Sequence, residues 1–268
     1  MQLLPTFVAA MLVLLSPSKT MATDDHQAKF KPTTPQFMGE AETLMSDLKE
    51  LGSKDIEQIM KVSTALADEV QSRCERWQAP FTEQNSRPAA FTFKGAVYTG
   101  LNTRTWTEDD MDFAQEHLRI LSGLYGVLRP KDLMQHYRLE MGLKWPNTAA
   151  VKNLYVFWGA KIKESIQQVD AEMVVNLASH EYSKAAQLKT LKQRVITPVF
   201  KDLVKGEYKA LMTYAKEARG TMAKFIIQNR ITDPIELKMF NGMGYQWDAS
   251  QSDAQTWLFT RDKKTLTS

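Results

Sequence analysis

The sequence predicts a mixed α/β (α+β) fold in a single domain over residues 11–260. Three short apolar runs, Met11–Leu15, Met173–Leu177 and residues 195–200, are typical of buried strands. Longer segments between them repeat their apolar residues at helical spacing, and the two kinds of segment do not alternate regularly. With 43% hydrophobic and 24% charged residues among 268, the chain has the composition of a soluble domain. This composition excludes a disordered, collagen-like or polytopic membrane protein.

The first fifteen residues are almost wholly apolar, and they favour a buried strand over a signal peptide. No Lys or Arg precedes Lys19, and the apolar run meets the polar residues 16–20 instead of an Ala-x-Ala-like cleavage site. The run is also short for a membrane span. We therefore expect a strand at Met11–Leu15 with a polar loop after it, and a cytoplasmic location. Residues 1–10 form an extension outside the domain, and Met11 is an alternative start.

Helical periodicity dominates the segment that follows this loop. Helices are expected over residues 35–50 and from residue 53 to about 76, with a break at residues 51–52. Cys74 lies near the apolar face of the second helix, where a small buried residue is expected. The alternation of residues 91–93 then predicts a short strand.

Helices and strands follow in irregular order to the carboxyl end. Thr107 and Asp110 resemble a capping box, which begins a helix that continues through Leu121. Residues 122–128 contain too much glycine for a helix and predict a strand or a tight turn. Pro198 restricts its strand to an edge or a bulge. The remaining expected elements are helices at residues 154–166 and 215–228 and after Asp233, strands at residues 173–177, 195–200, 208–214 and 257–259, and a tail at residues 261–268.

Positive charge is concentrated between Lys184 and Arg230. This stretch holds eleven basic and three acidic residues, a net charge of +8, whereas the whole chain carries +3. Such a concentration predicts a surface for the phosphates of nucleic acid or of a nucleotide, and an ordinary solvated face is the alternative. The candidate phosphate ligands in and after the expected helix are Lys216, Arg219, Lys224 and Arg230.

Polar residues also follow three expected strands. Ligands of open α/β sheets gather beyond the carboxyl ends of strands, so these residues could converge on one cleft. They are Lys19 after the first strand, Lys94 after residues 91–93, and Ser179 with Glu181 after Met173–Leu177.

A segment between Arg129 and Gly142 is unusually dense in polar residues for a connector. An Arg side chain there could bind phosphate or carboxylate, and a Tyr could stack or donate a hydrogen bond. A structural Arg–Glu pair is the equal alternative. The candidates from this segment are Arg129, Tyr137, Arg138 and Glu140.

Several signatures of enzymes and metal sites are missing from the sequence. It has no P-loop, no Gly-x-Gly-x-x-Gly after a strand, no His-Glu-x-x-His and no Gly-x-Ser-x-Gly. A single cysteine excludes an intramolecular disulfide and a Cys-rich zinc site, and the four histidines lack metal spacing. We therefore expect no cofactor and no metal, and we rank direct iron sequestration lowest.

Long motifs occur in a fixed order from Met11 to about Phe259. They include Ser16-Pro17-Ser18-Lys19-Thr20, residues 93–101, residues 121–130, Tyr137-Arg138-Leu139-Glu140-Met141-Gly142, residues 176–182 and residues 218–227. Together these motifs resemble the YaaA peroxide-stress-resistance family. The resemblance implies a cytoplasmic protein that limits peroxide damage, with a single domain of unusual fold, a basic cleft and a helix-hairpin-helix element that binds DNA. Ala96 stands where the family typically has Asp, which argues against a carboxylate or metal role there.

The best local candidate for the helix-hairpin-helix is residues 48–59. Such hairpins offer backbone N–H groups to a phosphate without reading sequence. Its turn consists of Leu51, Gly52, Ser53 and Lys54.

Two functions follow from these observations. The first, which we favour, is a non-enzymatic protein that binds double-stranded DNA independently of sequence and protects it when peroxide meets ferrous iron, with no membrane or protein partner. The alternative is an enzyme that acts on nucleotides or damaged nucleic acid in the same cleft, with Glu140 or Glu181 as acid or base.

Overall fold

A mostly parallel sheet of eight strands runs through the protein, in the order β4-β3-β1-β6-β7-β10-β9, with β8 paired to β7. The structure is a computed structural model that describes residues 11–23, 30–144 and 153–262. The strands of this sheet are β1 (Met11–Leu15), β3 (Leu118–Ser122), β4 (Gly126–Leu128), β6 (Met173–Leu177), β7 (Arg194–Val204), β8 (Glu207–Lys209), β9 (Gln246–Trp247) and β10 (Thr256–Arg261). A second, two-stranded sheet pairs β2 (Arg87–Pro88) with β5 (Leu133–Met134).

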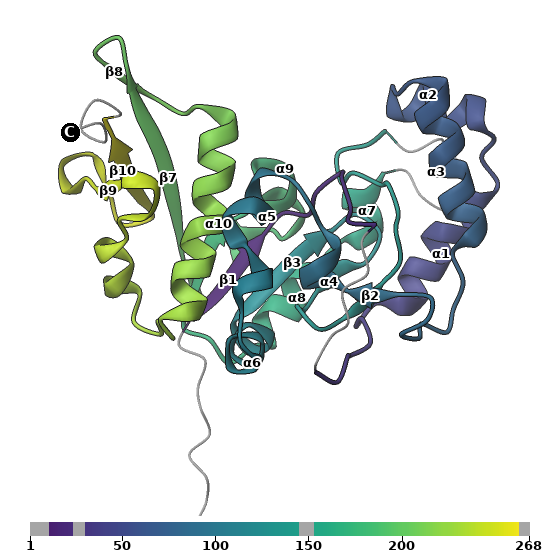
Figure 1. Ribbon diagram of the computed structural model, residues 1–268, viewed down its shortest axis with the longest axis horizontal. Coiled ribbons are helices and arrows are strands. Elements are labelled where there is room, and N and C mark those ends of the chain that lie inside the picture. Colours follow the sequence, from purple (N-terminus) through teal and green to yellow (C-terminus); the bar gives the residue numbers. More distant parts are fainter. Residues whose placement is uncertain (1–10, 24–29, 145–152, 263–268) are drawn as a thin grey trace, which may run out of the picture.

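Helices surround the sheet and extend the molecule to one side (Figure 1). The α-helices are α1 (Met38–Lys49), α2 (Ser53–Met60), α3 (Thr64–Arg76), α4 (Ala89–Thr92), α5 (Ala96–Leu101), α6 (Glu108–His117), α7 (Leu154–Trp158), α8 (Lys161–Gln167), α9 (His180–Ala185) and α10 (Met212–Gln228). Short 3-10 helices are η1 (Thr103–Thr105), η2 (Leu188–Thr190), η3 (Pro234–Met239), η4 (Gly242–Gly244) and η5 (Ala249–Gln251). In Figure 1, α1, α2 and α3 lie at one end of the molecule, and β7 to β10 with α10 lie at the other.

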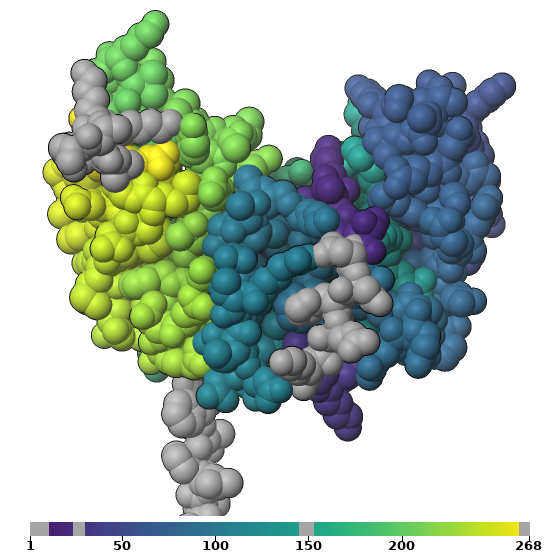
Figure 2. Space-filling view, in the orientation of Figure 1, coloured from purple at the N-terminus to yellow at the C-terminus, as the bar shows by residue number. Residues whose placement is uncertain are grey.

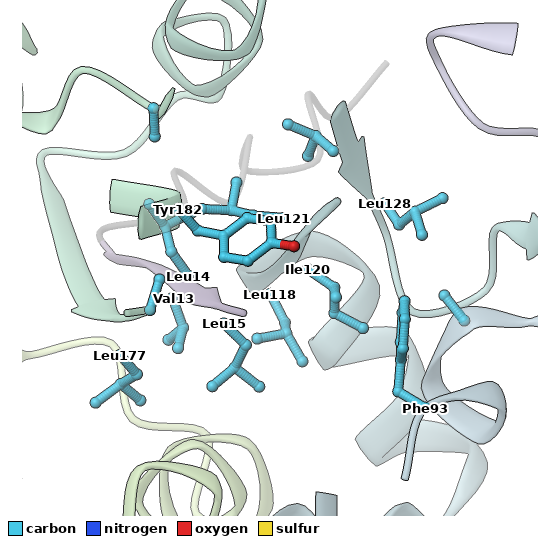
Figure 3. Packing of buried hydrophobic residues seen from close by; sticks show 14 of the residues in the cluster. Val13, Leu14, Leu15, Phe93, Leu118, Ile120, Leu121, Leu128, Leu177 and Tyr182 are labelled. Carbon is cyan, nitrogen blue, oxygen red and sulfur yellow. The ribbon is translucent and has the colours of Figure 1, made fainter. Parts of the chain in front are cut away.

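The predicted strand β1 is confirmed and lies inside the sheet. It pairs in parallel with β6 along its whole length, from Met11 opposite Met173 to Leu15 opposite Leu177. Its other edge pairs in parallel with β3. All five of its side chains are fully buried, which explains why this strand is a continuous apolar run and not an alternating one. Figure 3 shows Val13, Leu14 and Leu15 packed near Leu118, Ile120 and Leu177.

The order of the parallel strands reverses at β1. The chain passes from β1 to β3 on one side and later returns to β6 on the other side. Such a reversal point leaves a crevice beyond the carboxyl ends of the strands, where α/β proteins bind ligands. Ser16 and Ser179 lie just beyond these ends of β1 and β6.

Several other elements agree with the sequence. The capping box of α6 is present: Asp110 N–H donates to the Thr107 hydroxyl (3.1 Å), and Thr107 N–H donates to the Asp110 carboxylate (2.9 Å). Cys74 is buried, and burial is the main cause that raises the pKa of its thiol to about 11. Pro198 lies in β7, where only one edge of the strand is paired: β7 pairs with β6 up to Ile196 and with β10 from Thr197 onward.

Four predicted elements were wrong in type or extent. The helix expected from residue 53 to 76 is interrupted after α2 by Lys61, whose φ is 51°, before Ser63 caps α3. The helix expected at residues 154–166 is divided by Gly159 at φ 50°. The helix expected through Leu121 ends at His117, because Leu118–Ser122 pairs with β1 instead. The strand expected at residues 208–214 ends at Lys209, and α10 begins at Met212.

The strand predicted at residues 91–93 is also wrong. Residues Ala89–Thr92 form the short helix α4, because Ala89 N–H and Ala90 N–H donate to the carbonyls of Asp132 and Pro130. Phe93 forms only an isolated bridge with Met21. Lys94 therefore follows a helix and a bridge and not a strand of the main sheet.

No helix among the described residues combines the length and the apolar composition that a membrane span requires. The predicted extension at residues 1–10 lies outside the described residues, as do residues 263–268 of the predicted tail. Arg261 belongs to β10, where its guanidinium forms a buried ion pair with Asp202 (2.6 Å).

Candidate functional site

A cavity of about 540 Å³ lies beyond the carboxyl ends of β1 and β6, and we call it the central pocket. The surface is hollowed above the segment after β1, between the part that contains α10 and β8 and the part that contains α1 to α3 (Figure 2). The central pocket is lined by nine residues that the sequence analysis singled out: Lys19, Lys94, Tyr137, Arg138, Glu140, Ser179, Glu181, Lys216 and Arg219. Five of these carry a positive charge and two a negative charge, so the lining attracts anions.

Two serines join the strand ends at the bottom of this pocket. The backbone N–H of Ser179 donates to the hydroxyl of Ser16 (2.8 Å), which in turn donates to the hydroxyl of Ser179 (3.2 Å). The Tyr98 hydroxyl donates to the Ser16 carbonyl (2.9 Å). These bonds hold the loop after β1 against the loop after β6, which are 163 residues apart in sequence.

Glu140 lies between two cations of the pocket. Its Oε1 is 3.1 Å from Lys19 Nζ and 3.4 Å from a terminal nitrogen of Arg138. Neither contact has the geometry of a hydrogen bond, and both Glu140 Oε1 and Arg138 Nε are buried without a hydrogen-bond partner among the described residues. Arg138 and Glu140 therefore form an ion pair, but one polar atom of each side chain has no hydrogen-bond partner among the described residues.

Glu181 is held differently, through the backbone. The Gly142 N–H donates to Glu181 Oε1 (2.7 Å), and a Cβ atom at position 142 would approach this oxygen to 3.2 Å. Gly142, at the end of the polar segment, therefore leaves room for the Glu181 carboxylate.

Three tyrosines form the apolar part of the wall: Tyr98, Tyr137 and Tyr182. Each is more than 90% buried, and burial is the main cause that raises the pKa of each phenol far above its ordinary value. The Tyr137 hydroxyl is 2.7 Å from the hydroxyl of Ser122 at the end of β3. These phenols stay neutral at physiological pH, and the single O–H of Tyr98 is already used in its hydrogen bond to the Ser16 carbonyl.

Lys216 and Arg219 reach the pocket from the first half of α10. Neither side chain forms a hydrogen bond or an ion pair with any other residue that the structure describes. Burial lowers the pKa of the Arg219 guanidinium, and no carboxylate among the described residues pairs with it. A half-buried cation without an anionic partner indicates a place for an external anion.

The helix α10 is fixed against α5 by two glycines. A Cβ atom at Gly220 would lie 1.7 Å from the carbonyl oxygen of Val97, and one at Gly100 would lie 2.1 Å from that of Glu217. Only glycine permits this approach, which brings the two helices close together at the wall of the pocket.

Three of the predicted phosphate ligands lie outside the central pocket. Arg129 pairs with the buried Asp132 (2.9 Å) and donates to the Thr34 carbonyl (3.2 Å), so its guanidinium already has partners within the protein. Arg230 pairs with Asp110 (2.6 Å). Lys224 is not among the residues that line the pocket, because it lies more than one turn further along α10.

The predicted hairpin turn connects α1 and α2. At this turn Gly52 N–H donates to the carboxylate of Asp55 (3.1 Å), and the Ser53 hydroxyl donates to the carboxylate of Asp68. Two carboxylates thus occupy donors that a phosphate would need.

The sequence analysis missed several residues that line the central pocket. Met212 and Thr213 line the pocket beside Lys216, but the boundary between β8 and α10 was not predictable. Ser16 directly follows the first strand, so the rule that singled out Lys19 and Ser179 applies to it as well. Among the described residues, no group of three or more His, Cys, Asp or Glu side chains could hold a metal ion.

The fold and the pocket define a mixed α/β protein with a cation-lined cavity at the strand reversal of a mostly parallel sheet. The family model described as peroxide stress protein YaaA matches residues 11–251. A UPF0246 protein of Teredinibacter turnerae is 44% identical over 255 residues, covering 94% of this chain and 99% of its own length. A UPF0246 protein of Aliivibrio fischeri is 44% identical over 258 residues, covering 95% and 99%. The chain belongs to the YaaA (UPF0246) family of peroxide stress proteins.

Proposed function

We propose that this protein binds double-stranded DNA in the cytoplasm during peroxide stress and protects it from iron-mediated damage. The observation that supports this most is the pair Lys216 and Arg219, which face the central pocket without an ionic partner among the described residues. Lys19, Lys94 and Arg138 add positive charge from three other parts of the chain. A surface built in this way binds phosphates and reads no base sequence.

The central pocket is a stronger candidate for phosphate contact than the turn of the predicted helix-hairpin-helix. At the turn, Asp55 and Asp68 accept hydrogen bonds from Gly52 and Ser53, and Lys54 is its only cation. We therefore centre DNA contact on the pocket, and the turn adds at most a peripheral contact.

The double variant Lys216→Gln/Arg219→Gln tests the proposal. Each phosphate contact contributes about 0.9 to the slope of log affinity against log salt, so removing two should lower this slope by about 2. Fluorescence anisotropy of a labelled duplex, measured between about 50 and 200 mM salt, gives both affinity and slope. Lys192→Gln is the matched control because Lys192 is exposed and does not line the pocket. An unchanged slope in the double variant, or no duplex binding by the wild type at low salt, would contradict the proposal.

A second candidate function is an enzyme that acts on nucleotides or damaged nucleic acid. Its specific support is the position of Glu140 and Glu181 on the same pocket wall, with Oε1 of Glu140 lacking a hydrogen-bond partner among the described residues. A carboxylate here can accept a proton from a substrate and return it in a later step.

Glu140→Gln and Glu181→Gln test this candidate. If one carboxylate is the acid or base, its Gln variant should lose activity on damaged oligonucleotides by about 100-fold or more. The measurement is product formation under single-turnover conditions, with duplex affinity as the control for folding. Equal product from both variants and the wild type, or none from any of them, rules this function out while leaving DNA binding intact.

A further inference from the structure

A second cavity, of about 680 Å³, lies between α3, β2 and the segment after β5. Three arginines and one histidine line it, and we call it the arginine pocket: Arg73, Arg76, Arg87 and His136. Arg73 and Arg76 come from the last turn of α3, Arg87 comes from β2, and His136 follows β5. Glu83 is the one carboxylate among the described residues that line it.

The charges of this pocket act on one another. Burial and then the charge of Arg73 lower the pKa of His136, and the charges of Arg87 and Arg76 lower it further. Three guanidinium groups from two elements thus line the same cavity as the imidazole. Arg73 also pairs with Glu69, and Arg76 donates to the Ser72 hydroxyl (2.9 Å), which orients both side chains at the end of α3.

The wall of the arginine pocket continues into the wall of the central pocket. His136 and Arg138 are two residues apart, which is at most about 7 Å of extended chain, but they line different pockets. Tyr137 between them is anchored through its hydroxyl to Ser122. The segment after β1 connects the same two cavities, since Lys19 lines the central pocket and Thr23 the arginine pocket.

We propose that the arginine pocket is a separate phosphate-binding site, in which the guanidinium groups of Arg73, Arg76 and Arg87 and the imidazole of His136 surround one phosphate group. Guanidinium forks match the geometry of phosphate oxygens, and several of them from different elements fix its position. The imidazole supplies a further donor once the bound anion favours its protonated form. The same chemistry is offered by inorganic phosphate, by a mononucleotide and by a DNA backbone.

The ring signals of His136 in proton NMR spectra test this site directly. His136→Gln identifies its signals among those of the four histidines. Inorganic phosphate is added at constant ionic strength, with chloride as the reference anion. We expect phosphate to shift the His136 signals saturably and to raise the pKa of His136 relative to chloride. Identical titrations in phosphate and in chloride would overturn the proposal.

Variants assign the binding to the arginines. Arg76→Gln and Arg87→Gln should each weaken phosphate binding by about tenfold or more, and Arg73→Lys should weaken it because the charge remains but the fork is lost. Arg194→Gln is the matched control, since Arg194 is exposed and does not line the pocket. Thermal unfolding identifies any variant that fails to fold, and the remaining variants then decide. Equal weakening by Arg194→Gln would reduce the effect to overall charge and refute the site.

Two further titrations distinguish the sources of the phosphate group. A shift of the His136 signals with duplex DNA that is lost in Arg87→Gln identifies the DNA backbone. A shift with a nucleoside 5′-monophosphate but not with duplex identifies a small ligand, and either result supports the site. The inference does not rest on DNA binding, because Lys216→Gln/Arg219→Gln should remove duplex affinity through the central pocket and leave the response to inorganic phosphate unchanged.

Discussion

At the scale of single residues, two histidines link stability to pH. His117 is buried with its Nδ1 2.9 Å from the Met11 carbonyl and its ring stacked on Phe113. Burial is the main cause that lowers the pKa of His117, and burial together with Arg73 lowers the pKa of His136, from an ordinary value of 6.5. The unfolded chain therefore binds more protons than the folded one just below pH 6.5.

We expect the free energy of unfolding to fall as the pH drops from about 7 to 5, by at most about 1.4 kcal/mol per pH unit for each histidine. The sign follows because stability rises with pH wherever the unfolded state binds more protons. Denaturant titrations at several pH values measure it, with His117→Gln and His136→Gln as the variants that should flatten the profile. A profile that is as steep in the double variant as in the wild type would assign the effect to other groups.

Some residues of the central pocket could be predicted from the sequence. Lys19 and Ser179 were identified because polar residues follow apolar strand runs, and the structure brings them into one pocket. Arg129 and Arg230 looked equivalent to Arg138 and Arg219 in the sequence, but buried Asp132 and Asp110 pair with them. The partner of Arg230 is Asp110, which is distant in the sequence. Sequence composition alone could therefore not distinguish arginines that pair within the protein from arginines that could bind a phosphate.

At the scale of elements, the contact between α5 and α10 has the strictest steric requirement of the site. Gly220→Ala would place a methyl group 1.7 Å from the Val97 carbonyl oxygen, inside a packed backbone contact. We expect a loss of about 3 kcal/mol or more in the free energy of unfolding, together with weaker duplex binding, because both helices carry pocket residues.

Gly39→Ala provides the matched control for this substitution. Gly39 is in the first turn of α1, and a Cβ atom there would meet nothing within 4 Å. This change should leave stability unchanged or raise it by up to about 1 kcal/mol. Equal effects of the two substitutions in urea unfolding would show that the helix contact is not closely packed in solution.

The misplaced end of the helix before β3 shows where periodicity fails. Leu118 and Leu121 continue the helical spacing of the residues before them, yet Leu118–Ser122 joins the sheet because β1 offers a parallel edge. The run Met173–Leu177 was predictable because it is apolar throughout. Apolar periodicity therefore identifies segments that fit only a helix or only a strand. Where a segment fits both, pairing with the rest of the sheet decides its structure.

At the scale of the whole molecule, the proposed DNA contact should leave a specific pattern of amide protection. We expect a saturating duplex to slow hydrogen exchange in residues 16–20, in the first turns of α5 and α10 and in residues 179–182, all of which contribute to the central pocket. Residues 51–54 should change little, because their donors are occupied by Asp55 and Asp68. Mass spectrometry of the exchanged protein measures both regions together. Protection confined to residues 51–54 would show that DNA contacts the turn and not the central pocket.

The central place of β1 has a consequence for synthesis of the chain. Its neighbours, Leu118–Ser122 and Met173–Leu177, are translated long after it, so most of the polypeptide must be made before both edges of the strand are paired. During that interval five consecutive apolar side chains are exposed on the ribosome, and such segments are prone to aggregate. We therefore expect a nascent chain of this protein to depend on ribosome-associated chaperones until residue 177 has left the exit tunnel.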